Sequence, residues 1–145
     1  MRIFTVFPLL LIPVAIYNIM AVSGSNFATV DYVRSRLDED FRAVPMASDT
    51  LWHITPGHAL IGLTIVLLFF ELLKSTGFGR AAIMNHAFSM VLFIVCLVEF
   101  LMFPAFATSV FFLIMMMTLL DVMAGFIVTI ASARRDFAIS EGYSD

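Results

Sequence analysis

The chain has 145 residues, of which 61% are apolar and only 13% are charged, and its mean hydropathy is +1.01. Soluble domains carry about 25% charged residues, so this composition excludes an ordinary soluble domain and predicts one multi-pass membrane domain over residues 1–145. The net charge of −3 offers no basic surface, so no nucleic-acid partner is expected. With a single cysteine, Cys96, the chain cannot form an intrachain disulfide.

Four apolar segments predict an all-α fold of four transmembrane helices in an antiparallel bundle. About 20 apolar residues cross the hydrocarbon core of a bilayer. Thr55 followed by Pro56 is expected to start one helix, and Thr108 or Ser109 is expected to cap another. The spans are expected at about residues 3–21, 56–73, 81–103 and 108–133.

Residues 25–45 form the surface segment of the first, outer loop. Its apolar residues recur at helical spacing with charged residues between them, and Pro45 would stop a helix. This pattern predicts a short amphipathic helix on the membrane surface or against a partner, with a loosely ordered loop as the alternative. Trp52 is then expected at the membrane interface.

The basic residues favour one orientation in the membrane. With both ends inside, the inner side carries five of them and the outer side three: Arg2, Lys74, Arg80, Arg134 and Arg135 against Arg34, Arg36 and Arg42. Cytoplasmic loops are enriched in Lys and Arg, so both termini are expected in the cytoplasm, in the plasma (bacterial inner) membrane.

Asp121 lies near the middle of the fourth predicted span. A carboxylate at the centre of such a helix costs about 2.5–3.5 kcal/mol on insertion scales, so it must face protein, water or a partner. Small and polar residues lie on its side of the helix at steps of three or four: Thr118, Gly125, Thr129 and Ser132. This stripe predicts the interior face of the helix.

Glu99, in the third span, shares a helical face with Asn85, Ser89 and Cys96. This polar line and the one through Asp121 are expected to face each other or a shared partner. The two acids should differ in depth by about 10–15 Å. The lines are interpreted either as contacts that hold the helix hairpin together, or as a proton or ion relay through Glu99 and Asp121, with water, Ser89 and Thr118 between them.

The remaining polar residues are interface candidates. Glu71 is expected to pair with Lys74 or to reach the interface. His58 and His86 begin helices on opposite sides of the membrane, so one chain cannot hold a haem between them, and an interface position is expected for both.

No metal or cofactor is expected. A zinc-like set of His53, His58 and Glu99 lacks a recognisable spacing, and the three side chains of Met115–Met117 point in three directions, which does not suit copper.

No enzyme signature and no catalytic residues are found: the chain has no phosphate-binding glycine loop and no nucleophile–base constellation. Two classes of function remain. One is a non-catalytic accessory or stabilising subunit of a larger membrane complex. The other is a small proton- or cation-coupled transporter or channel, which would need a homo-oligomer because four helices enclose little water. The expected partners are the lipid bilayer and either other membrane subunits or further copies of the chain.

Overall fold

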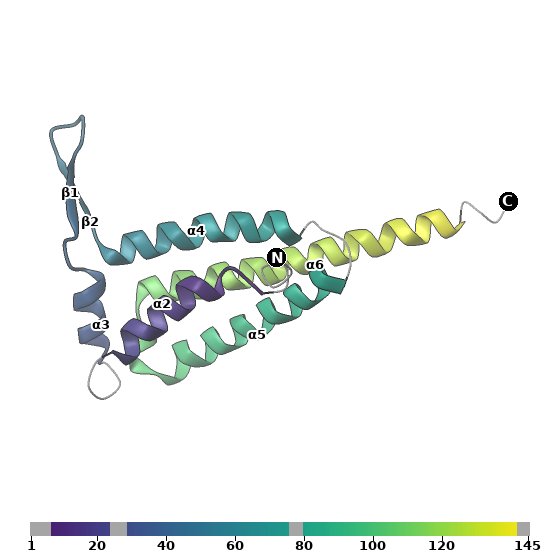
Figure 1. Ribbon diagram of the computed structural model, residues 1–145, viewed down its shortest axis with the longest axis horizontal. Helices are drawn as coiled ribbons and strands as arrows, with labels where there is room; N and C mark the ends of the chain where they lie inside the picture. Colours follow the sequence, from purple (N-terminus) through teal and green to yellow (C-terminus); the bar gives the residue numbers. More distant parts are fainter. Residues whose placement is uncertain (1–6, 24–28, 76–79, 142–145) are drawn as a thin grey trace.

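The computed structural model describes residues 7–23, 29–75 and 80–141, and it describes side chains over residues 7–23, 29–74 and 83–131. The elements in chain order are α2 (Leu11–Val22), α3 (Val30–Leu37), β1 (Arg42–Pro45), β2 (Leu51–Ile54), α4 (Pro56–Ser75), α5 (Arg80–Met102), the 3-10 turn η1 (Pro104–Phe106) and α6 (Ser109–Glu141). Helix α6 runs between α4 and α5, packs against both, and extends beyond them (Figure 1).

Three of the described helices are long and apolar enough to cross a membrane: Pro56–Lys74, Ile83–Met102 and Ser109–Ala131. The helices expected at 56–73 and 81–103 are confirmed, and the one expected at 108–133 continues to Glu141. The expected caps are present as well. The Thr55 hydroxyl accepts the amide of His58, and the Thr108 hydroxyl accepts the amide of Phe111, both at 3.2 Å.

The first apolar segment forms a shorter helix than expected. Helix α2 has 12 residues, fewer than the roughly 20 that a straight span requires, so the expected set of four spans is not confirmed. The first residues of the expected 3–21 span, up to residue 6, lie outside the described part of the chain. Pro13 lies in the first turn of α2, where a proline removes no intrahelical hydrogen bond.

The surface segment is only partly helical. Helix α3 is capped by the Thr29 hydroxyl and buries Val33 and Leu37. The prediction of a helix reaching Pro45 is wrong, because β1 pairs with β2 in an antiparallel hairpin that aligns Val44 with Trp52. Asp49, at φ 57°, closes the short turn between the strands, in a conformation that aspartate tolerates.

Apolar packing is concentrated where α2, η1 and the start of α6 meet. Tyr17 is fully buried there against Phe106 and Phe111. Its hydroxyl donates to the carbonyl oxygen of Ala105 at 3.0 Å and shares a 2.6 Å hydrogen bond with the Thr108 hydroxyl. These contacts join α2 to the α5–α6 turn.

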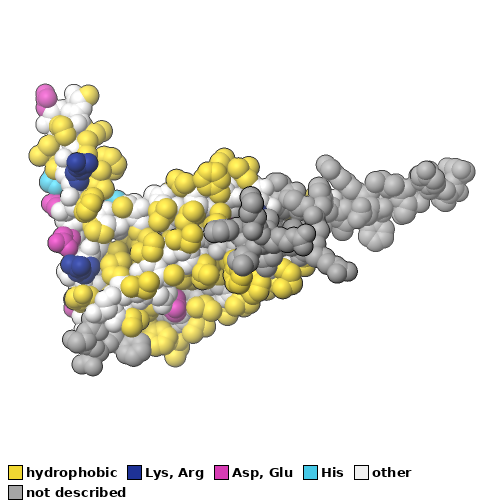
Figure 2. All heavy atoms as spheres, in the orientation of Figure 1, with side chains coloured by type: hydrophobic (Ala, Val, Ile, Leu, Met, Phe, Trp, Pro, Cys, Tyr) yellow, Lys and Arg dark blue, Asp and Glu magenta, His cyan; other side chains and the backbone are white. Residues whose placement is uncertain are grey.

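Hydrophobic side chains also cover much of the outside of the bundle. Figure 2 shows them along the flank of the helices, whereas most of the coloured charged side chains gather on the column made by α3 and the hairpin. An apolar flank with a charged column at one end is the distribution expected of a protein that sits in a bilayer.

Candidate functional site

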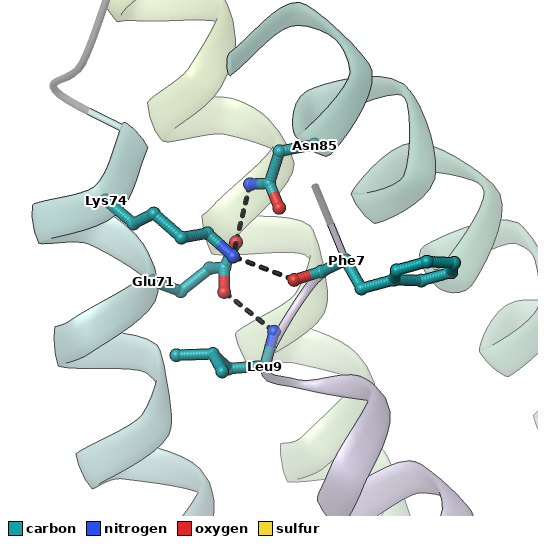
Figure 3. Close-up of polar contacts among 5 residues, drawn as sticks. All are labelled: Phe7, Leu9, Glu71, Lys74 and Asn85. Atoms are coloured by element: carbon teal, nitrogen blue, oxygen red, sulfur yellow. Dashed lines mark hydrogen bonds and ion pairs between the residues drawn. The ribbon is translucent and has the colours of Figure 1, made fainter. Parts of the chain in front are cut away.

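A buried carboxylate, Glu71, joins the end of α4 to α5 and to the residues just before α2 (Figure 3). Its side chain is fully buried and accepts hydrogen bonds from the Leu9 amide at 2.7 Å and the Asn85 side-chain amide at 2.5 Å. The Lys74 ammonium lies 3.0 Å from the carboxylate and also donates to the Phe7 carbonyl oxygen at 2.8 Å. The predicted pairing of Glu71 with Lys74 is therefore confirmed, but the carboxylate is enclosed by protein and does not reach the interface.

The local structure explains why the carboxylate is held there. Residues Phe7 to Leu10 lie just before α2, so their peptide groups are not all used inside a helix and remain available to side chains. Glu71 and Lys74 are three residues apart and so lie on one face of α4. A charged group out of water needs several such partners, because leaving a carboxylate buried without them costs several kcal/mol.

A second group of buried polar atoms lies beside this network, between α5 and α6. Asp121 is 3% exposed and lies within electrostatic reach of Ser89, Glu71, Lys74 and His86. Four buried atoms of this group have no hydrogen-bond partner among the described residues: Asn85 Oδ1, His86 Nε2, Ser89 Oγ and Asp121 Oδ2. We call Asn85, His86, Ser89 and Asp121 the inner polar cluster.

Gly125 makes room for the imidazole of this cluster. A Cβ built on Gly125 would overlap the His86 ring, and Phe126 contacts the same ring edge-on with centroids 4.8 Å apart. Gly125 lies one turn after Asp121 on α6. The His86 ring of α5 fits between the two helices at this level because Gly125 has no side chain.

The two predicted polar lines pack against each other only in part. Thr118 and Asp121 on α6 are buried, as are Ser89 and Cys96 on α5. Thr118 donates its hydroxyl to the Met115 carbonyl of its own helix at 2.7 Å. Thr129 is exposed and donates its hydroxyl to the Gly125 carbonyl of its own helix, so the interior stripe ends earlier than expected. The Ser132 side chain lies outside the described residues.

Glu99 lies apart from Asp121. It is ten residues after Ser89 on α5, so it lies about 15 Å further along the helix, which agrees with the expected difference in depth. Its carboxylate is half-buried and accepts one hydrogen bond, at 3.3 Å, from the side-chain amide of Asn18 on α2. The structure therefore separates the two acids that a direct relay would have to connect.

Glu99 and Asn18 form one end of an apolar groove between α2 and α5. The groove has a volume of about 370 Å³. The rings of Phe7 and Phe88 stack 5.1 Å apart at its other end. The walls between these ends are apolar: Leu11, Val14, Val91, Leu92 and Val95. The groove thus offers apolar surface along its length and a carboxylate at one end.

Of the four interface candidates, His58 and Trp52 occupy exposed positions, whereas Glu71 is enclosed and the His86 ring packs against Gly125 and Phe126 of α6. His58 lies in the first turn of α4 with its ring beside the Thr55 amide, and Trp52 lies on the hairpin. Among the residues that the structure describes, no three His, Cys, Asp or Glu side chains lie close enough together to hold a metal ion.

Sequence reasoning missed three groups of the site: the Leu9 amide, Asn18 and Tyr17. The first cannot be found from residue type, because it is a backbone group 62 residues from its acceptor. Asn18 and Tyr17 carried a signal, namely two polar side chains in a strongly apolar helix. Comparison of the chain with protein-family models, with curated proteins and with solved structures gave no match in any of the three.

Proposed function

We propose that the protein is a non-catalytic subunit that stabilises a larger assembly of membrane proteins. In this proposal the α2–α5 groove receives a helix of a partner subunit. The chain sits in the plasma membrane with both termini in the cytoplasm, and α2 together with the residues before it serves as a fourth crossing.

The observation that carries this proposal is the position of Glu99 at the end of the groove. A carboxylate within a membrane-spanning helix is costly unless it has a polar partner, and Glu99 receives one long hydrogen bond from the described residues. A partner helix that places a Lys, Arg, Ser or Thr side chain beside Glu99 would supply the missing donor, while its apolar side chains fill the groove. Asp121 is buried within the chain, so of the two acids only Glu99 is available to a partner.

The test is the native mass of the protein extracted in mild detergent, with an absorption spectrum of the same sample. Unrelated large subunits that co-migrate with the protein would support the proposal and identify its assembly. We expect Val95→Trp, which fills the groove, to abolish this association. The control is Val98→Trp, on an exposed part of α5 outside the groove, which we expect to leave it unchanged.

Glu99→Gln tests how much the carboxylate contributes to association, separately from the apolar walls of the groove. Hydrogen bonds between helices in membranes contribute about 0.6 kcal/mol on average, so association should weaken roughly threefold, and by more if the partner is cationic. Association that persists unchanged in both Val95→Trp and Glu99→Gln would refute the groove as the contact site.

The inner polar cluster favours a second candidate, a proton-coupled transporter that works as a homo-oligomer. A carboxylate, an imidazole, a hydroxyl and an amide with free hydrogen-bonding atoms can hold water and pass protons within a membrane. This candidate predicts a homo-oligomer and proton flux in liposomes. The flux should disappear in Asp121→Asn and persist in Glu99→Gln, because Glu99 lies about 15 Å from the cluster. Flux that survives Asp121→Asn would exclude the cluster from the mechanism.

A further inference from the structure

The β1–β2 hairpin lies across the end of the bundle. Figure 1 shows α3 and the hairpin as a column that runs crosswise to the long helices, at the end where α4 begins, with the hairpin reaching past α4 to one side. An element crosswise to membrane-spanning helices at their ends lies parallel to the membrane surface.

The hairpin exposes large apolar side chains. Phe41 is 78% exposed, Leu51 60%, Trp52 51% and Met46 47%. A two-stranded hairpin is marginally stable by itself in water, so it gains stability when one of its faces packs on a surface. The structure joins the two strands to each other through their ladder, with the Phe41 amide extending it by a 3.0 Å bond to Ile54.

A bilayer around the candidate spans would adjoin the hairpin. Helix α4 carries exposed apolar side chains along its length: Leu63, Ile65, Val66, Phe69, Phe70 and Leu73. Lipid that covers this flank of α4 ends at the level where α4 begins, which is the level of the hairpin. Tryptophan is enriched at such interfaces because its ring is apolar and its N–H is polar.

The strand register distinguishes the two faces of the hairpin. Val44 lies opposite Trp52 and Arg42 lies opposite Ile54 on one face, whereas Leu51 and His53 lie on the other. Val44 and Ile54 are the two strand residues that are half-covered, so the face of Trp52 is the one turned toward the bundle. The opposite face carries a polar pair, with His53 Nδ1 3.1 Å from an Asp40 carboxylate oxygen.

We propose that the β1–β2 hairpin is a membrane-surface anchor that rests on the bilayer beside α4, with the Trp52 face against lipid and the Leu51–His53 face toward water. The anchor works by apolar contact. Acidic residues around the hairpin outnumber basic ones, Asp38, Glu39, Asp40 and Asp49 against Arg36 and Arg42, so it does not depend on anionic lipids. This inference is independent of the proposed function.

Trp52 is the only tryptophan of the chain, so the intact protein carries its own probe. The protein is reconstituted in phosphatidylcholine vesicles. Its emission is measured with lipids brominated near the glycerol end or near the methyl end of the acyl chain, and with iodide on both sides of the membrane. We expect a blue-shifted emission, stronger quenching by the shallow bromines than by the deep ones, and protection from iodide. Adding an anionic lipid should change none of these results.

The matched control moves the tryptophan by one residue to the other face, in the Leu51→Trp/Trp52→Phe double variant. Its emission should be quenched by iodide and should respond less to brominated lipid. Iodide quenching of native Trp52 without lipid quenching would overturn the proposal. So would protection from both quenchers, which would indicate a protein contact. The result for the native protein decides the proposal even if the double variant does not fold.

Discussion

Glu71, Glu99 and Asp121 are the acidic residues of the three spanning segments, and each has different surroundings. Glu71 is enclosed with three donors, Asp121 is enclosed beside atoms that have no hydrogen-bond partner within the described part of the chain, and Glu99 faces a groove. The free-energy cost of burying a polar group is highest where neither water nor another partner is present, so the three surroundings imply different roles. The first is structural, the second suits water or a proton, and the third suits a partner.

Gly125 gives the sharpest prediction for a single residue. In Gly125→Ala the new methyl group would overlap the His86 ring, and the ring is held by Phe126 on another side. Overpacking of this kind costs about 1–3 kcal/mol, so the free energy of unfolding in mixed micelles should fall by that amount. Removing the ring as well, in Gly125→Ala/His86→Ala, should show a strong coupling between the two changes.

Gly62 is the control for that substitution. It also lies inside a spanning helix, but an added Cβ meets no atom within 4 Å. Gly62→Ala should leave stability unchanged or raise it by up to about 1 kcal/mol, because alanine loses less entropy in a helix. Equal effects at Gly62 and Gly125 would show that the contact with His86 does not limit the packing.

At the scale of elements, Glu71 is the connection between α4, α5 and the start of α2. In Glu71→Gln an amide replaces a carboxylate that faces three donors, and Lys74 loses its counter-charge. Breaking a buried pair costs about 3–5 kcal/mol, so we expect a loss of unfolding free energy in that range and faster hydrogen exchange at the Leu9 amide.

Glu39→Gln is the matched control for this connection. Glu39 pairs with Arg36 at 3.3 Å, also three residues apart, but both side chains are more than half exposed. Exposed pairs contribute about 0–1 kcal/mol, so this change should have little effect on stability. A loss below 1 kcal/mol in Glu71→Gln would mean that α2 is held by its other contacts, those of Tyr17 and Asn18 among them.

The elements differ in how far the sequence predicts them. Helices α4, α5 and α6 follow from apolar length and from the caps Thr55 and Thr108, which are local signals. The hairpin was missed because its turn has no glycine. The sequence carries a weaker hairpin signal than a glycine turn would, namely Asp49 as a turn residue between Val44–Pro45 and the strand-forming residues Leu51–Ile54. The partners of Glu71 and Glu99 on α2 were missed because they depend on how α2 packs, which no local pattern specifies.

At the scale of the whole molecule, the position of α2 decides where the N-terminus lies. Helices α4, α5 and α6 are long and apolar enough to make three crossings. At 1.5 Å per residue, α2 is only about 18 Å long. Yet the segment contacts Lys74, at the end of α4, through the Phe7 carbonyl, and Thr108, at the start of α6, through Tyr17. The long side chains of Lys74 and Tyr17 let a short helix connect both levels of the bundle.

We therefore expect α2 and the residues before it to complete a fourth crossing, with both termini in the cytoplasm. In closed spheroplasts, tags at either terminus should resist added protease, and Ser35→Cys on α3 should react with an impermeant maleimide. Cys96 is buried and should not interfere. An N-terminal tag digested from outside, with the C-terminal tag protected, would place α2 as a helix that enters the membrane without crossing it. In that case the α2–α5 groove would open toward the outer surface, and the partner helix expected beside Glu99 would have to enter from that side.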